Sequence, residues 1–131
     1  MKIRRCFVDT NVFLRSVLDD NKEQAKKAKV LFEDAIINKV ELKSTILVYF
    51  EAYWVLGSRY GLKGKELVSV LLDMLDLKVS FSKKRLLRVA VMEMDKFGYD
   101  LEDAFIFFSA KEMEVEEFVS FDQKLVKKFS R

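Results

Sequence analysis

The sequence predicts an α/β fold in which a short parallel sheet is flanked by helices on both faces. Two observations lead to this prediction. Short apolar or alternating segments recur along the chain, and between them lie longer segments whose apolar residues repeat every three or four positions. Strands that alternate with helices in this way form parallel sheets. The chain has 131 residues, enough for a proper core, and we expect a single domain over 1–131.

Four short segments have the composition of strands. The first is an apolar run that we expect to be buried, and the other three mix apolar and polar residues in alternation. They cover residues 3–8, 39–44, 77–81 and 117–121. Ligands of parallel sheets bind beyond the carboxyl ends of the strands, so the residues that follow these segments are candidates for a site.

Amphipathic segments fill the intervals between the predicted strands. Thr45 is a plausible N-cap for the helix that follows the second strand, Gly98 ends a later helix, and Asp100 caps the next one. The predicted helices cover residues 11–18, 22–38, 45–60, 65–75, 83–97 and 100–113, with a basic tail helix after Asp122.

The composition excludes several kinds of enzyme. The chain has no histidine, which removes Ser-His-Asp and Cys-His catalysis and any imidazole general base. Its single cysteine excludes an internal disulfide and a zinc site built from cysteines. The four glycines form neither a GxGxxG motif nor a Walker A loop. If the protein is an enzyme, carboxylates must do most of the chemistry, alone or through a hard cation.

Neither a membrane span nor a secretory leader is expected. No apolar run approaches the roughly 18 residues that cross a bilayer. The apolar stretch after the basic start MKIRR is broken by Asp9 within a few residues. We therefore expect a cytoplasmic protein. The formal net charge of +3 is modest and gives only weak support for an anionic partner.

Four acidic residues lie at positions where either a structural or a functional role can explain a carboxylate. Asp9 follows the first strand in "FVDTN" and Asp122 follows the last in "SFDQK", although each can simply cap the helix after it. Glu51 lies among apolar residues in "TILVYFEAYWVL", where a buried carboxylate needs a salt bridge or a cation, unless that face is exposed. Asp103 lies one turn beyond Asp100, at a helix end that favours acids with no function required.

A parallel sheet would bring these carboxylates together. If the first and last strands are adjacent, Asp9, Asp103 and Asp122 lie at one edge of the sheet, and Glu51 reaches that edge from a helix. Two carboxylates about 5 Å apart repel by roughly 3 kcal/mol at an effective dielectric of about 20. Protonation or a bound divalent cation relieves the repulsion, and an all-oxygen site suits Mg²⁺ or Mn²⁺.

These motifs, in this order, resemble the PIN-domain ribonucleases, in particular the VapC-type toxin of VapBC toxin–antitoxin pairs. The resemblance covers essentially the whole chain and rests on "FVDTNVFL", "TILVYFEAYWVL", "DLEDAFIFFSAKEM" and "FVSFDQKL". It implies a PIN-like three-layer fold. It also implies a catalytic set that holds one or two Mg²⁺ or Mn²⁺ ions, made of Asp9, Glu51, Asp103 and Asp122. The supporting polar positions fall on Asn11 and Ser120, and Asp100 competes with Asp103.

The resemblance implies an activity and its partners. The activity is metal-dependent hydrolysis of RNA phosphodiester bonds, which leaves 5′-phosphate and 3′-hydroxyl ends. The partners are the RNA, a cognate antitoxin that covers the site, and a second copy of the chain in a homodimer. The apolar residues of "AFIFF", 104–108, cannot all face one side of a helix, so some are expected against a neighbouring element or subunit.

Basic side chains would hold the RNA backbone by charge, and each of them can equally be part of a solvated surface. Trp54 is expected to pack in the core. The candidate RNA-binding residues are Arg15, Arg59, Lys63, Lys65, Lys124, Lys127 and Lys128.

Other functions remain open at this point. The chain could be a PIN nuclease of RNA processing rather than a toxin, or a non-catalytic interaction module on the same fold. A phospho-accepting receiver domain would need an acidic pair after the first strand, which "FVDTN" lacks. A haloacid-dehalogenase phosphatase would need a second aspartate two residues after Asp9, where Asn11 stands.

Overall fold

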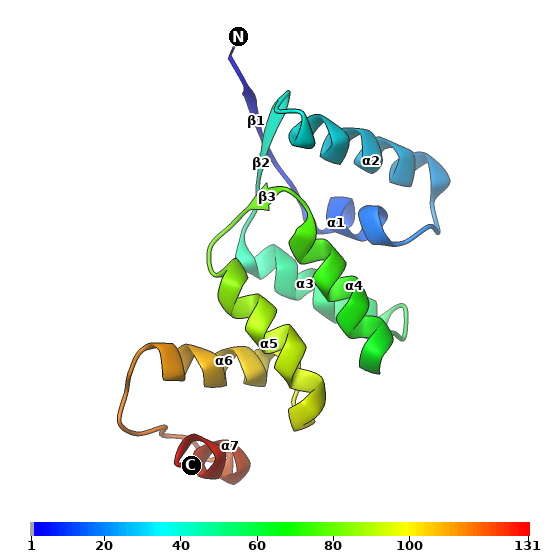
Figure 1. Ribbon diagram of the computed structural model, residues 1–131. Coiled ribbons are helices and arrows are strands. Elements are labelled where there is room, and N and C mark those ends of the chain that lie inside the picture. Colours follow the sequence, from blue (N-terminus) through cyan, green and yellow to red (C-terminus); the bar gives the residue numbers. More distant parts are fainter. Residues whose placement is uncertain (1) are drawn as a thin grey trace. The chain divides into compact units, whose positions relative to one another are not determined.

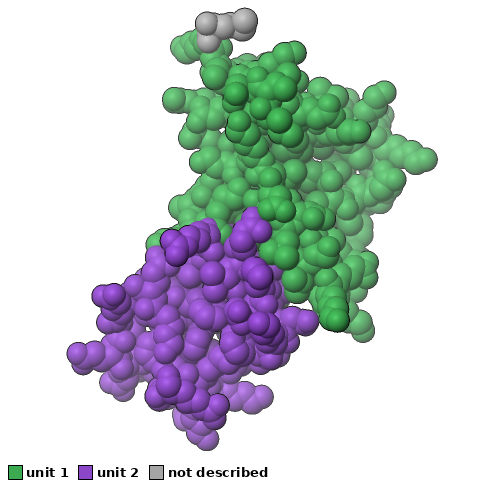
Figure 2. Space-filling model, viewed as in Figure 1, with its two compact units in different colours: residues 1–84 green, residues 85–131 purple. Residues whose placement is uncertain are grey.

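The computed structural model describes residues 2–131, which divide into two compact units (Figure 2). Unit 1 extends to Lys84, and unit 2 covers Arg85–Arg131. The expectation of a single domain over 1–131 stays a prediction.

Unit 1 contains a three-stranded parallel sheet in the order β1-β2-β3, as expected for an α/β fold (Figure 1). Leu42 of β2 is paired with Cys6 of β1 on one side and with Val79 of β3 on the other. The strands are β1 (Arg4–Phe7), β2 (Val40–Lys43) and β3 (Val79–Ser80). Three of the four predicted strands are therefore confirmed.

The first strand is less buried than its apolar sequence predicts. Within β1, Phe7 is 62 % exposed, whereas Val8, just after the strand, is 1 % exposed. In β2 and β3, by contrast, Val40, Leu42 and Val79 are all buried. Within the described part of unit 1, β1 pairs with β2 alone, and the residue of this segment that enters the core is Val8, one position beyond the strand.

Four helices of unit 1 build its core. Helix α1 packs against α2, α3 and α4, and the buried hydroxyl of Tyr49 on α3 donates a hydrogen bond of 2.9 Å to the carbonyl of Leu71 on α4. The Thr45 hydroxyl caps α3 by accepting a hydrogen bond from the backbone N–H of Val48, as predicted. The helices are α1 (Thr10–Val17), α2 (Lys22–Ile36), α3 (Ile46–Ser58) and α4 (Gly64–Asp76).

Unit 2 is helical, with a core rich in phenylalanine. Phe107 of α6 and Leu125 and Phe129 of α7 form a buried cluster, while Ile106 is 51 % exposed. The phenylalanine-rich helix thus places neighbouring residues on opposite sides, as the sequence predicts. Gly98 ends α5 with a positive φ of 68°, a conformation that glycine adopts without strain. The helices are α5 (Lys84–Phe97), α6 (Leu101–Glu112) and α7 (Gln123–Phe129).

The fourth predicted strand, residues 117–121, is wrong. This segment is irregular, and Val119 and Phe121 are 87 % and 102 % exposed. An alternating pattern becomes a strand only where a neighbouring strand supplies hydrogen bonds and a surface to pack against. In residues 85–131, all of which are described, no strand is present. The pattern therefore finds no partner within its own unit.

No helix among residues 2–131 has the length and apolar character needed to cross a bilayer.

Candidate active site

In unit 1 the first predicted acid lies at the start of α1. Asp9 follows β1, and its Oδ1 accepts a hydrogen bond of 2.7 Å from the backbone N–H of Thr10, so that its side chain caps the helix. The capping role considered for Asp9 is therefore present. The carboxylate is exposed, which leaves it accessible to a ligand as well.

Thr10 connects this acid to the second one. The Thr10 side chain is 6 % exposed, and its hydroxyl donates a hydrogen bond of 2.9 Å to Oε2 of Glu51. The same residue therefore bonds to Asp9 through its backbone N–H and to Glu51 through its side chain. Two carboxylates from distant parts of the sequence are held beside one residue at the start of α1.

Glu51 is not in the environment that the sequence predicts. It is exposed, as are Leu47 and Trp54 on either side of it along α3. The buried side of α3 is formed by Val48, Tyr49, Ala52 and Leu56. The desolvation argument for Glu51 and the placement of Trp54 in the core are both wrong. The sequence does not show which side of this helix is buried, because α3 is apolar on its solvent-exposed side too.

In unit 2 two predicted acids cap helices. Asp100 caps α6 by accepting a hydrogen bond of 2.8 Å from the backbone N–H of Asp103. Asp122 caps α7 and accepts from the backbone N–H groups of Lys124 and Leu125 at 3.1 and 3.2 Å. The Ser120 hydroxyl accepts from the backbone N–H of Asp122 at 3.0 Å, so Ser120 supports Asp122 directly.

The third acid of this unit is electrostatically coupled to the other two. Partial burial raises the pKa of Asp103, and the negative charges of Asp100 and Asp122 raise it further. Asp100, Asp103 and Asp122 therefore share one neighbourhood. Each retains oxygen atoms for a ligand, and their mutual repulsion is the kind that a cation offsets.

The predicted four-carboxylate set is divided between the units. Asp9 and Glu51 belong to unit 1, whereas Asp103 and Asp122 belong to unit 2. Over the described range 2–131, no three acidic or cysteine side chains form a group arranged to hold a metal ion. The donor chemistry fits Mg²⁺ or Mn²⁺, since every candidate ligand is an oxygen. The complete four-residue site stays a prediction.

The predicted RNA-binding residues fall into two groups. Arg15 and Lys128 are engaged within the protein, because the Arg15 guanidinium pairs with Asp20 and the Lys128 ammonium lies 2.9 Å from the ring centre of Phe97. The others are exposed on the surface, namely Arg59, Lys63, Lys65, Lys124 and Lys127.

Thr10 is the residue that the sequence analysis missed. The motif indicates Asn11 as the supporting residue after Asp9, yet Asn11 is exposed and Thr10 is buried. A signal was available in the sequence. Thr10 lies three and four residues before Phe13 and Leu14, which places all three on the buried face of α1.

Comparison with known proteins identifies the family. No protein of established annotation matches the chain. The PIN domain family matches residues 6–129, which include every acidic residue discussed above. PIN domains are generally nucleases, typically use Mg²⁺ or Mn²⁺ and bind RNA. With its parallel α/β sheet and an acid directly after the first strand, the chain belongs to the PIN domain family.

Proposed function

We propose that this chain is a Mg²⁺- or Mn²⁺-dependent ribonuclease and the toxin of a type II toxin–antitoxin pair. The observation that carries the proposal is the hydrogen-bonded connection from Asp9 through Thr10 to Glu51, in a chain of a nuclease family. Carboxylates that serve only as caps need no such connection. A buried threonine that holds a second, exposed carboxylate beside the first favours a site.

The residues proposed to hold the cation are Asp9 and Glu51 from unit 1 and Asp103 and Asp122 from unit 2. When bound by these residues, Mg²⁺ or Mn²⁺ would supply Lewis-acid chemistry that activates water and offsets negative charge at the phosphate. Asn11 and Ser120 are proposed to support this set, and Ser120 already contacts the backbone of Asp122.

Within this site the protein groups position the reactants. Thr10 fixes the orientation of the Glu51 carboxylate, and the backbone N–H of Thr10 does the same for Asp9. Water attacks the phosphorus, the bond to the 3′ oxygen breaks, and the products carry 5′-phosphate and 3′-hydroxyl ends. Partial burial, followed by the negative charges of Asp100 and Asp122, raises the pKa of Asp103, and a cation bound beside these acids would offset their repulsion.

Cleavage of RNA by designed variants tests the proposal. Wild-type protein is incubated with RNA in Mg²⁺ or Mn²⁺ and in EDTA, beside Asp9→Asn and Glu51→Gln. We expect cleavage only by the wild type with metal. Glu66→Gln is the matched control, because Glu66 is an exposed glutamate in the first turn of α4, outside the proposed set. Cleavage that survives the chelator and both active-site substitutions would refute the metal–carboxylate mechanism.

A second experiment asks whether carboxylates of both units bind the same ion. Mn²⁺ is paramagnetic and broadens NMR signals of nearby nuclei, so its addition should broaden backbone signals near Glu51 and near Asp103 together. Glu51→Gln should weaken the broadening at both places. If the substitution changes only the signals of unit 1, the two acidic pairs bind separate ions.

The toxin role is supported by the resemblance of the motifs and their order to VapC-type proteins. It predicts growth arrest on expression in the cytoplasm, relieved by Glu51→Gln and by a co-expressed antitoxin. A nuclease of RNA processing would cleave RNA without arresting growth, and a non-catalytic module would do neither. Exposed apolar side chains such as Ile106 and Met113 support the proposed homodimer, which light scattering can test.

A further inference from the structure

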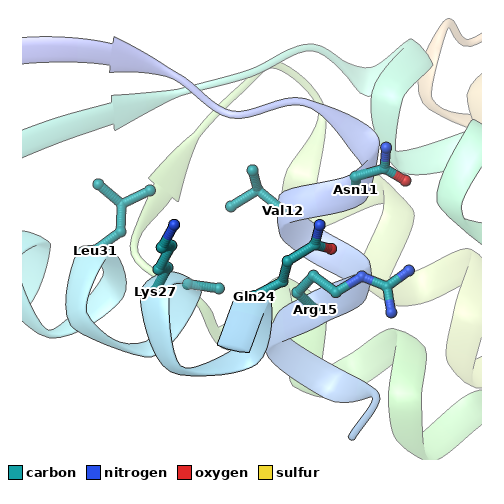
Figure 3. A pocket seen from close by; sticks show the side chains of 7 residues that line it. Asn11, Val12, Arg15, Gln24, Lys27 and Leu31 are labelled. Atoms are coloured by element: carbon teal, nitrogen blue, oxygen red, sulfur yellow. The ribbon is translucent and has the colours of Figure 1, made fainter. Parts of the chain in front are cut away.

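A pocket of about 300 Å³ lies between α1 and α2, within unit 1 (Figure 3). On each helix the lining positions recur three or four residues apart, so they occupy one face of that helix. Its size is at the lower end of the range for small-ligand sites. The side chains that carry the argument are Asn11, Val12 and Arg15 from α1 and Gln24, Lys27 and Leu31 from α2.

The walls of this pocket, called the α1–α2 pocket below, combine two kinds of chemistry. Val12 and Leu31 provide an aliphatic surface that can pack against a flat ring. Asn11 and Gln24 bring amide groups that both donate and accept hydrogen bonds. Lys27 adds a positive charge at an exposed position, where it also forms a solvent-exposed ion pair of 3.8 Å with Glu23, and none of the lining residues is acidic. This combination matches a nucleobase with its phosphate.

Arg15 lines the pocket, but its guanidinium is engaged within the protein. Its guanidinium is occupied at the outer nitrogens, by Asp20 and by the hydroxyl of Tyr60. Its Nε–H is buried and has no hydrogen-bond partner within the described part of the chain. Because this nitrogen is fully buried, Arg15 shapes the wall of the pocket, and the accessible polar groups are those of Gln24 and Lys27.

The pocket and the proposed active site both include residues at the start of α1. Asn11 lines it, two residues after Asp9 and one after Thr10, on the first turn of α1. A base bound here would contact the turn of α1 that follows Asp9 in the sequence. The mixture of amides and a cation around the pocket suits a single base.

We propose that the α1–α2 pocket binds one base of single-stranded RNA beside the bond that is cleaved and thereby selects the cleavage sequence. This inference rests on the proposed ribonuclease function. Gln24 reads the base edge, the aliphatic wall packs against its face, and Lys27 attracts the adjoining phosphate.

The test uses exposed residues, so that the fold is preserved. Gln24→Ala removes an amide, and only the backbone N–H of Gln24 takes part in the capping bond with Asn21. Lys27→Ala removes the charge, and Lys26→Ala is the control with the same charge change on the same helix, outside the lining residues. Thermal unfolding verifies that all three variants are folded.

Two measurements separate the pocket from the catalytic proposal. In the first, a random-sequence RNA pool is cleaved and the cut sites are sequenced. We expect Gln24→Ala to reduce the preference at one position beside the cut about tenfold, while Lys26→Ala leaves it unchanged. In the second, the Glu51→Gln protein binds short RNAs in EDTA, and Gln24→Ala and Lys27→Ala weaken that binding.

Each outcome decides one proposal. Weakened binding by both pocket variants, together with a wild type that never cleaves, would support the pocket and refute the nuclease. Unchanged RNA binding and an unchanged cut-site preference would overturn the pocket proposal. The pocket proposal is also overturned if Gln24→Ala and Lys27→Ala keep RNA binding and lose only a co-purifying protein. The pocket would then bind a protein partner.

Discussion

Thr10→Val is the sharpest perturbation of the proposed site. The substitution keeps a β-branched side chain of nearly the same shape at a position that is 6 % exposed, and it removes the hydroxyl that donates to Glu51. It leaves the backbone N–H that bonds to Asp9. Only one of the two connections is therefore cut.

The magnitude follows from the geometry of that bond. A hydrogen bond to a charged group contributes about 1.5–3 kcal/mol. Glu51 is exposed, so water can replace the lost donor, and we expect the free energy of unfolding to fall by only about 1 kcal/mol. Water cannot restore the orientation of the carboxylate. If the whole bond energy is used in the transition state, kcat falls by about 10- to 150-fold.

The assay is RNA cleavage under steady-state conditions, with kcat and KM measured separately. We expect Thr10→Val to lower kcat with little change in KM, and Thr10→Ser to recover most of the activity because it keeps the hydroxyl. Glu51→Gln provides the inactive reference. The reasoning is refuted if Thr10→Val retains the wild-type kcat, or if Thr10→Ser loses as much activity as Thr10→Val.

Three further predictions concern stability, each measured by thermal unfolding. The pKa of Asp103 is raised in the folded protein, so ionisation of this carboxyl lowers the free energy of unfolding as the pH rises through the raised pKa. Asp103→Asn removes the charge and should therefore raise Tm at neutral pH. This gain should vanish below the ordinary pKa of 3.8, where the carboxyl is protonated in both states. A gain that persists in acid contradicts this reasoning. The hydrogen bond from the Tyr60 hydroxyl, followed by the charge of Arg15, lowers the pKa of Asp20. The charged Asp20 therefore stabilises the folded protein above pH 3.8, and this stabilisation is lost as the pH falls through the lowered pKa. Asp20→Asn should therefore lower Tm at neutral pH and lose this effect in acid, and a pH-independent effect would point to another cause. Tyr49→Phe removes the buried hydrogen bond to the α4 backbone and should cost about 1 kcal/mol, whereas an unchanged Tm would mean that this bond contributes nothing.

Local features of this protein were predictable because they depend on neighbouring residues. Thr45 and Asp100 cap the helices that follow them, since a side-chain oxygen needs only the backbone N–H groups of the next turn. Three strand segments and the parallel direction of their pairing were also predictable from the alternation with helices.

Features that depend on distant partners were not predictable. The segment 117–121 alternates like a strand, but no strand of its own unit lies beside it. Glu51 and Trp54 look buried in an apolar run, yet the packing of α3 against α1 and α4 turns a different side inward. A uniformly apolar sequence does not specify which side of a helix faces the core, because burial depends on the neighbouring elements.

The composition restricts the chemistry that a site in this protein can use. Without histidine and with one cysteine, only oxygen ligands and carboxylates were available, and their order along the chain indicated the PIN family. The tertiary structure decided which groups meet. It placed Thr10 between Asp9 and Glu51, because the fold of α1 against α3 brings together residues that the sequence separates by a helix and a strand. Hydrogen bonds over such distances are set by packing, and no local pattern encodes them.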